Sequence, residues 1–419
     1  MIWQELTTGI YPWDIHDEGI ENILDNLQAM AGNNAAYMLA IMHHEKRPLH
    51  ANYYPHNPVR KRYIAEDSRC YFHIHPECYA NSRIKPLPSE RDFLKDVDWL
   101  DLFVRALRRR GMKTGAEISH TPLDAKRGLA LYADCLQRDI YGNPPPYGIM
   151  TGQQLCWNSK DARDYVYAIA ADLATHYDLD MIQTCSLLYN PGRLDIHPLL
   201  GVTLGGCFCE NCEREARAQG LDWDAILRTV RGLADIVSRA DIDSQEAFHT
   251  LRQGDSSHTS FLLEYPALYE WLLFRTRSVT RYLQGLTQAI HAANPKVEFR
   301  LNTCWKEGEM HGLNLAEAGK VVDSIRMMDY SEQTGDIALV TNKTKWLANV
   351  RRMVGEEKKI IAGIAPRHLA TPELVKLGIR QVSLGGADGL SYGFYDGAPY
   401  ENLRAIREAM EDYGIKLAK

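Results

Sequence analysis

Three neighbouring stretches decide the fold: Ser324–Asp329 reads SIRMMD, Lys343–Val354 reads KTKWLANVRRMV, and Lys359–Ala365 reads KIIAGIA. The first and third are short apolar runs, which are typical of buried strands. The middle stretch has apolar residues at three- and four-residue spacing, which predicts a helix. A strand, a helix and a second strand in this order predict one unit of a parallel sheet wound with helices.

The same alternation recurs along the chain. We expect further strands at Ala35–Met42, Lys113–Ser119, Asp180–Ser186, Val297–Thr303 and Gly389–Tyr395. Further helices are expected at Phe93–Arg109, Asp161–His176, Leu262–Ala293 and Tyr400–Tyr413. An eighth strand would close a barrel, and its candidates are Leu129–Cys135, Ile10–Ile15 and Arg380–Leu384.

We therefore predict an α/β fold, a (β/α)8 TIM-type barrel with long loop insertions. A doubly wound open sheet is the alternative, but no Gly-rich phosphate loop opens a helix after a strand. At 419 residues, with 45% hydrophobic and 24% charged residues, the chain can bury one large core. A single barrel over residues 1–419, with insertions at about 47–90 and 187–212, accounts for the whole length. These insertions are expected to shape the substrate cleft, because loops after strands form the active-site face.

Composition excludes some partners. The formal net charge is -6 and both signs are interspersed, which argues against a nucleic-acid partner. Nowhere do 18 apolar residues run together, and the start MIWQE has no leader pattern, so we expect no membrane partner and a cytoplasmic location. Nine cysteines, an odd number, fit reduced thiols.

Three cysteines crowd into Cys207–Cys212, which reads CFCENC. Thiolates this close suit a metal ion better than disulfides, and tetrahedral zinc needs a fourth ligand from elsewhere in the chain. Cys156, just before a predicted helix, is the leading candidate for that ligand, and Cys135 is the alternative. A structural zinc ion is the favoured interpretation over metal-free buried cysteines or a catalytic zinc with one open position.

The stretch from about 150 to 220 resembles the family-42 β-galactosidases and related barrel glycoside hydrolases. Those proteins carry C-P-N-S-P-x-x-R before a helix, L-A-x-x-Y at a helix end, then a strand and a C-x-C-x-x-C cluster. The matching segments are Cys156–Arg163 (CWNSKDAR), Leu173–Tyr177 (LATHY) and CFCENC. Gly386–Tyr392 (GADGLSY) is similar to the start of the last strand in many such barrels.

The resemblance implies a glycosidase with a carbohydrate substrate and, by analogy, a homo-oligomer. It also implies a four-cysteine structural zinc site made of Cys156, Cys207, Cys209 and Cys212. The family carries its acid/base as an Asn-Glu pair shortly after the strand that precedes the cysteines. The matching stretch here, DMIQTCSLLY from Asp180, has no Glu, so its catalytic pattern diverges.

Glycoside hydrolysis uses two carboxyl groups that flank the scissile bond. The candidates are carboxylates near strand ends: Asp329, Glu332, Glu307 and Glu117. The leading pair is Glu307 with Asp329 or Glu332, because these residues follow apolar strands directly.

Other side chains after strands are expected to bind the sugar by stacking or hydrogen bonding: His43, His44, His120, Trp305, Tyr330, Arg367, His368 and Tyr392. Arg367 would suit a carboxylate on the ligand, as in a uronic acid. Two alternatives stay open. The histidines, with His73 and His75, would hold a catalytic metal in a metal-dependent hydrolase, or the barrel would bind sugar without catalysis.

Overall fold

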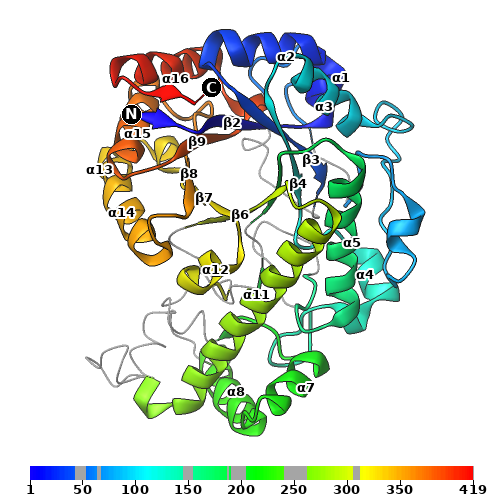
Figure 1. Cartoon of the computed structure of the whole chain (residues 1–419). Helices are drawn as coiled ribbons and strands as arrows, with labels where there is room; N and C mark the ends of the chain where they lie inside the picture. Colours follow the sequence, from blue (N-terminus) through cyan, green and yellow to red (C-terminus); the bar gives the residue numbers. More distant parts are fainter. Residues whose placement is uncertain are drawn as a thin grey trace.

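The computed structural model of the protein describes residues 1–42, 53–63, 68–144, 154–185, 188–189, 204–239, 262–304 and 312–418. Eight parallel strands form a closed barrel in chain order from β2 to β9 (Figure 1). The predicted TIM-type barrel is therefore confirmed. Its strands are β2 (Glu5–Ile10), β3 (Ala35–Ile41), β4 (Lys113–Ile118), β5 (Met181–Thr184), β6 (Glu298–Cys304), β7 (Ser324–Met328), β8 (Lys359–Gly363) and β9 (Gly389–Phe394).

The eighth strand is β2, which the sequence pattern missed. It closes the barrel by pairing with β3 on one side and with β9 on the other, where Glu5 lies opposite Gly389. Its sequence, ELTTGI, alternates Glu5, Thr7 and Gly9 along one face, and the strand is fully buried. A strand with polar residues on the face that lines the barrel lacks the continuous apolar run expected of a buried parallel strand.

The three proposed eighth strands were wrong, because each lies in or enters a helix. Pro12 starts a helix two residues after β2, and Pro at the first helical position is favoured there. Most of Ile10–Ile15 belongs to α1 (Pro12–Glu18). Leu129–Cys135 runs from α4 (Ala125–Leu131) into η4 (Ala133–Cys135). Arg380–Leu384 is the end of α15 (Pro372–Leu384).

Helices cover the outside of the barrel (Figure 1). Side-chain caps fix several of their starts: Ser159 accepts a hydrogen bond from the Ala162 N–H, and Thr371 accepts one from the Leu374 N–H. Within the described residues, no helix has the combined length and apolar character needed to cross a bilayer. Besides α1, α4 and α15, the helices are α2 (Ile20–Asn26), α3 (Trp99–Arg109), α5 (Lys160–His176), α7 (Glu210–Ala218), α8 (Trp223–Arg239), α11 (Pro266–Ala293), α12 (Leu315–Val321), α13 (Ile337–Thr341), α14 (Lys343–Val354) and α16 (Tyr400–Asp412).

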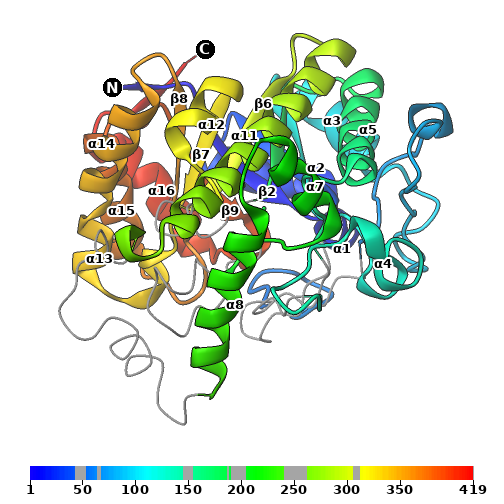
Figure 2. The ribbon, with the colours of Figure 1, turned by 90° about the horizontal axis from the view of Figure 1, so that it is seen from below.

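The excursion between β5 and β6 is larger than the sequence suggested. The pattern placed an insertion at about 187–212, but the chain continues through α7 and α8 before it returns along α11. Figures 1 and 2 show α7 and α8 packed beside the far end of α11, which projects beyond the barrel. At 28 residues, α11 is about 42 Å long, so it reaches well past the strands.

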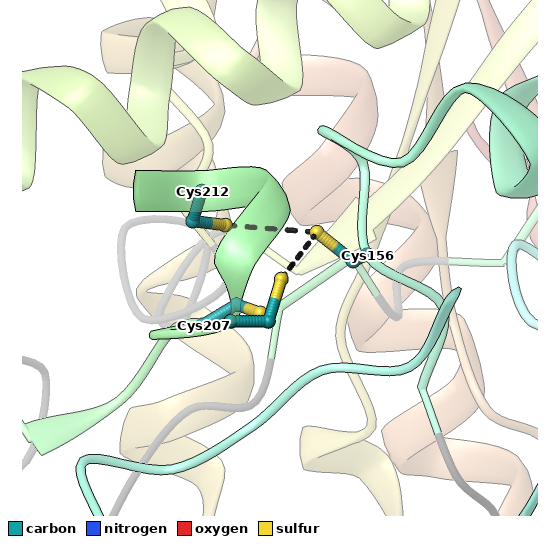
Figure 3. A group of neighbouring side chains, drawn as sticks. Cys156, Cys207 and Cys212 are labelled. Carbon is teal, nitrogen blue, oxygen red and sulfur yellow. Dashed lines mark hydrogen bonds between the residues drawn. The ribbon is translucent and has the colours of Figure 1, made fainter. Parts of the chain in front are cut away.

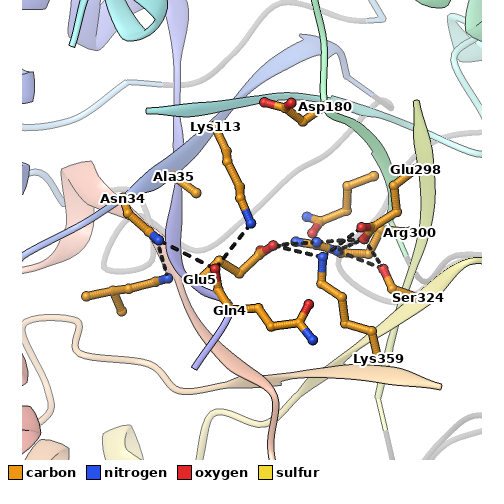
Figure 4. Close-up of polar contacts among 12 residues, drawn as sticks. Gln4, Glu5, Asn34, Ala35, Lys113, Asp180, Glu298, Arg300, Ser324 and Lys359 are labelled. Atoms are coloured by element: carbon orange, nitrogen blue, oxygen red, sulfur yellow. Dashed lines mark hydrogen bonds and ion pairs between the residues drawn. The ribbon is translucent and has the colours of Figure 1, made fainter. Parts of the chain in front are cut away.

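The floor of the barrel, at the amino ends of the strands, is filled by charged side chains. Arg300 donates to Glu5 (Nη2 to Oε2, 2.9 Å) and to Glu298 (Nη2 to Oε1, 2.7 Å), and it is buried. Lys359 Nζ lies 2.7 Å from Glu298 Oε2 and 3.1 Å from Glu5 Oε2 (Figure 4). These contacts pair the buried charges with one another, which makes their burial tolerable.

The short strands at the two ends of the described chain lie below this floor. β1 (Ile2–Trp3) pairs in parallel with β10 (Lys416–Leu417), which brings both ends to the same side of the barrel (Figure 1).

Candidate functional site

The mouth of the barrel, at the carboxyl ends of the strands, is where active sites of this fold lie. Glu117 is the penultimate residue of β4 and is 6% exposed. Its Oε2 accepts a hydrogen bond from Gln183 Nε2 at 2.5 Å, and Gln183 pairs with it in register on β5. A carboxyl group therefore lines the upper barrel and faces a neutral amide.

Polar residues from three further strands line the interior near Glu117. Arg326 on β7 donates to Asn302 on β6 (Nη1 to Oδ1, 3.2 Å), and its guanidinium lies 6.0 Å from the ring centre of Tyr37 on β3. Burial raises the pKa of Tyr37 to about 12, although the charge of Arg326 opposes this rise. Tyr37 therefore stays a phenol at neutral pH, and its hydroxyl donates to the Gly393 carbonyl at 3.2 Å.

Gln183, Asn302, Arg326 and Tyr37 were not predicted as site residues, because each lies inside a strand rather than after one. One signal was available: β6 alternates Glu298, Arg300 and Asn302, so its polar side chains share one face. In a barrel wrapped by helices, that face must be the interior.

Asp329 directly follows β7 and stands at the edge of the mouth. Its Oδ2 lies 2.7 Å from Lys343 Nζ and accepts a hydrogen bond from Ser331 Oγ at 2.5 Å. The Asp329 side chain is 9% exposed, whereas Lys343 is fully buried. A positive neighbour favours the ionised form of a carboxyl group.

Glu332 sits behind Asp329, within the helix layer. It is fully buried, its Oε2 accepts from the Ala365 N–H at 3.1 Å, and its Oε1 lies 3.0 Å from Lys343 Nζ. A Cβ placed on Gly378 of α15 would come within 2.3 Å of Glu332 Oε1, so the carboxyl packs directly on that helix. Burial raises the pKa of Glu332, and Lys343 offsets only part of this rise. These contacts are those of a residue that stabilises the packing of the fold.

Of the other predicted site residues, Tyr330 and Arg367 lie in segments that follow strands. Tyr330 follows Asp329 and is 42% exposed. The Arg367 side chain packs against Gly397, 3.3 Å from a Cβ built there, and the neighbouring His368 ring meets Tyr53 edge-on at 5.2 Å.

His120 and Tyr392 are placed in the packed shell around the strands. His120 is fully buried, with Nδ1 2.8 Å from the Tyr282 hydroxyl of α11. Tyr392 is 1% exposed, and its hydroxyl donates to Asn33 Oδ1 at 2.7 Å. Four predicted residues, Glu307, His43, His44 and Trp305, lie outside the described residues.

The four predicted zinc ligands come together. Cys156, Cys207, Cys209 and Cys212 form a group whose sulfur atoms all lie within 4.8 Å of one another. Cys156 Sγ is 3.6 Å from Cys212 Sγ (Figure 3) and 3.4 Å from Cys209 Sγ. Zinc–sulfur bonds of about 2.3 Å in a tetrahedron put sulfur atoms about 3.8 Å apart, so this donor set fits zinc.

The surroundings of the cluster also suit thiolates. Asn158 Nδ2 donates to Cys212 Sγ at 3.3 Å, and the Arg138 N–H donates to Cys207 Sγ at 3.4 Å. Donors of this kind orient metal ligands from outside. Hydrogen bonds from the other cysteines lower the pKa of Cys209, whereas burial raises the pKa of Cys212.

Cys135, the alternative fourth ligand, is not part of this group. It lies instead beside Asp134 and Asp161, where Arg83 contacts both carboxylates.

Comparison with solved structures gives matches along nearly the whole chain. The glycoside hydrolase domain of PgaB (BpsB) from Bordetella bronchiseptica matches with a TM-score of 0.61 and 14% identity over 98% of both chains. The β-galactosidase from Halorubrum lacusprofundi matches with a TM-score of 0.57 and 16% identity, and the match spans 98% of this chain but 58% of that one. The catalytic domain of β-amylase from Paenibacillus polymyxa gives 0.54 and 10% identity over 99% of both chains. The chain has the barrel fold of these glycoside hydrolases.

No model of a known protein family matches the sequence, and no curated protein matches it. At 10–16% identity the structural matches establish the fold alone.

Proposed function

We propose that this protein is a glycoside hydrolase that acts on a glycoside or oligosaccharide with carboxyl groups at the mouth of its barrel. Among the described residues, Glu117 and Asp329 are the proposed catalytic pair. They come from β4 and from the end of β7, and both stand at the end of the barrel where this fold carries its active sites. Glu307, from the sequence analysis, is retained as a third candidate.

The observation that carries this proposal is the polar lining around Glu117. Gln183, Asn302, Arg326 and Tyr37 come from four strands, and their hydrogen-bonding groups replace the branched apolar side chains that usually fill such a barrel. Sugar hydroxyls are recognised by convergent groups of this kind. Tyr330, half-exposed after β7, offers a ring face for stacking on a sugar.

We also propose that Cys156, Cys207, Cys209 and Cys212 hold a structural zinc ion, as in the family-42 β-galactosidases that this segment resembles. The sulfur spacing and the N–H donors to sulfur support a closed four-thiolate site. The ion would fasten the start of α7 to the turn before α5. Its chemistry there is structural, because four thiolates leave no position for substrate.

The proposal is tested by hydrolysis of a panel of aryl glycosides and oligosaccharides, with released reducing ends as the readout. We expect turnover by the wild type and a loss of about 10²- to 10⁴-fold in Glu117→Gln and in Asp329→Asn, the range typical of removing acid–base catalysis. Glu332→Gln is the matched control, because it removes a carboxylate that contacts the same lysine but is fully buried. Wild-type rates in both mouth variants would contradict the assignment.

Two other functions predict different outcomes. A sugar-binding barrel would show no turnover by the wild type, with sugar binding retained in Glu117→Gln. A histidine-based metal hydrolase would lose activity on chelation while the fold persists. Within the described residues, the histidine-containing group with metal-ligand spacing is His75, Asp172 and His176, which lies away from the mouth.

A further inference from the structure

A second group of metal-ligating side chains lies on the flank of the barrel. His75 Nδ1 is 2.8 Å from Asp172 Oδ1, and His176 Nδ1 is 2.9 Å from the same oxygen. Asp172 and His176 are one turn apart on α5, while His75 comes from the segment between β3 and α3 and precedes η3 (Pro76–Tyr79). Three possible ligand atoms from two distant parts of the sequence therefore lie close together.

Asp172 is the buried member of this group. Its side chain is fully buried, and its ion-pair partners among the described residues are these two imidazoles. A buried carboxylate is costly without a compensating charge.

We propose that His75, Asp172 and His176 bind a divalent transition-metal ion such as zinc, at a site separate from the four cysteines and independent of the proposed glycosidase activity. Two imidazoles and one carboxylate form a donor set that such ions accept.

Binding of an ion requires the two imidazoles to turn from their stacked arrangement. Ligand atoms around tetrahedral zinc with bonds of 2.0–2.1 Å lie about 3.3 Å apart, slightly more than the distances between the His and Asp atoms here. The two imidazole rings stack with centroids 3.5 Å apart, and an ion near the plane of both rings would part them. The histidine side chains are 23% and 27% exposed, so an ion can enter from solvent while buried Asp172 stays fixed.

The position of the site indicates a structural role. α5 ends just before β5 begins, so the group lies near the amino ends of the strands, the end of this fold that serves stability. The His75 backbone N–H also donates to Asp172 Oδ2 at 3.2 Å, so the segment around η3 already contacts α5 here. A bound ion would pin that segment to the barrel.

The test is zinc bound per chain after chelation, reloading with zinc and gel filtration, measured by mass spectrometry together with the melting temperature. We expect two zinc ions per chain in the wild type. Cys209→Ser should keep one ion, the one bound by His75, Asp172 and His176. His176→Gln and His75→Gln should each lose one ion and the associated rise in melting temperature on zinc addition. His291→Gln is the matched control and should keep both ions, because His291 pairs with Asp323 at 2.9 Å in a two-residue contact.

If Cys209→Ser does not fold, the two histidine variants still decide the question against the wild type. Zinc content and zinc-dependent melting equal to those of the wild type in both variants would overturn the proposal. This test measures bound metal and melting temperature rather than turnover. Failure of the metal-site proposal therefore does not affect the proposed glycosidase activity, and failure of the proposed activity does not affect the metal site.

Discussion

The two ends of the barrel interior both hold charged side chains, but their contacts differ. At the floor, Glu5 and Glu298 are each bound by both Arg300 and Lys359. At the mouth, Glu117 accepts a hydrogen bond from the neutral amide of Gln183, and Asp329 pairs with Lys343. The floor charges satisfy one another, whereas the mouth carboxyl groups lie at the end that this fold opens to ligands. The floor charges bind one another across the barrel, whereas the mouth carboxylates are those that we propose to act on a substrate.

The comparison predicts its largest stability effect at the floor. Arg300→Met leaves the buried carboxylate of Glu5 and the partly buried carboxylate of Glu298 with Lys359 as their remaining positive partner, so we expect a loss of about 3–5 kcal/mol in the free energy of unfolding, as for other broken buried pairs. Urea denaturation measures it. A loss below about 1 kcal/mol would mean that the floor network contributes little beyond packing.

Acid should weaken the floor. Burial alone would raise the pKa of Glu298, but Arg300 and Lys359 outweigh it and lower that pKa to about 2. The folded pKa thus lies below the unfolded value of about 4.3, so this contribution is present above pH 4.3 and is lost as pH falls towards 2. Urea denaturation across this window should show a steeper decline in the wild type than in Arg300→Met. Equal slopes would argue against the Arg300 contribution.

A smaller stability effect is expected behind the mouth. In Gly378→Ala, the new Cβ would lie 2.3 Å from Glu332 Oε1, and we expect a cost of about 1–3 kcal/mol from overpacking, with turnover unchanged. Glu332→Ala should reduce that cost in a double-mutant cycle. Gly232→Ala on α8 is the matched control, because nothing lies within 4 Å of its Cβ position, and helix propensity should make it neutral or stabilising.

The smallest effect is expected on the surface. Arg105 on α3 pairs with Asp101 one turn away, and their side chains are 72% and 39% exposed. Arg105→Ala should change stability by about 0.5 kcal/mol or less, because solvent screens such pairs. A loss comparable to that of Arg300→Met would remove the distinction between buried and exposed charge on which the comparison rests.

The sequence predicted the barrel because seven strands carry apolar runs, and apolar periodicity reports burial directly. It missed β2, whose interior face carries Glu5 and Thr7, because a buried polar strand is recognised only once its partner Arg300 is placed beside it. The spacing of Cys207, Cys209 and Cys212 predicted a metal-binding cluster, whereas Cys156 was selected by its position before a helix and by the family resemblance.

The candidate site was predicted only in part, because the direction of a side chain depends on its tertiary contacts. Asp329 and Glu332 are three residues apart, yet one stands at the mouth and the other is buried on α15. Local sequence does not fix which way each carboxyl points. The polar lining of Gln183, Asn302 and Arg326 depends on strand register, which is a property of the closed barrel.

The most direct test of this account measures turnover and melting temperature together in Glu117→Gln and Arg300→Met. We predict that Glu117→Gln keeps the wild-type melting temperature but loses about 10²- to 10⁴-fold in turnover. Arg300→Met should have a lower melting temperature than the wild type, while its folded fraction still turns over substrate. Wild-type turnover in Glu117→Gln, or a loss of stability there as large as in Arg300→Met, would contradict the account. In that account the mouth carboxylates serve catalysis and the floor charges serve stability.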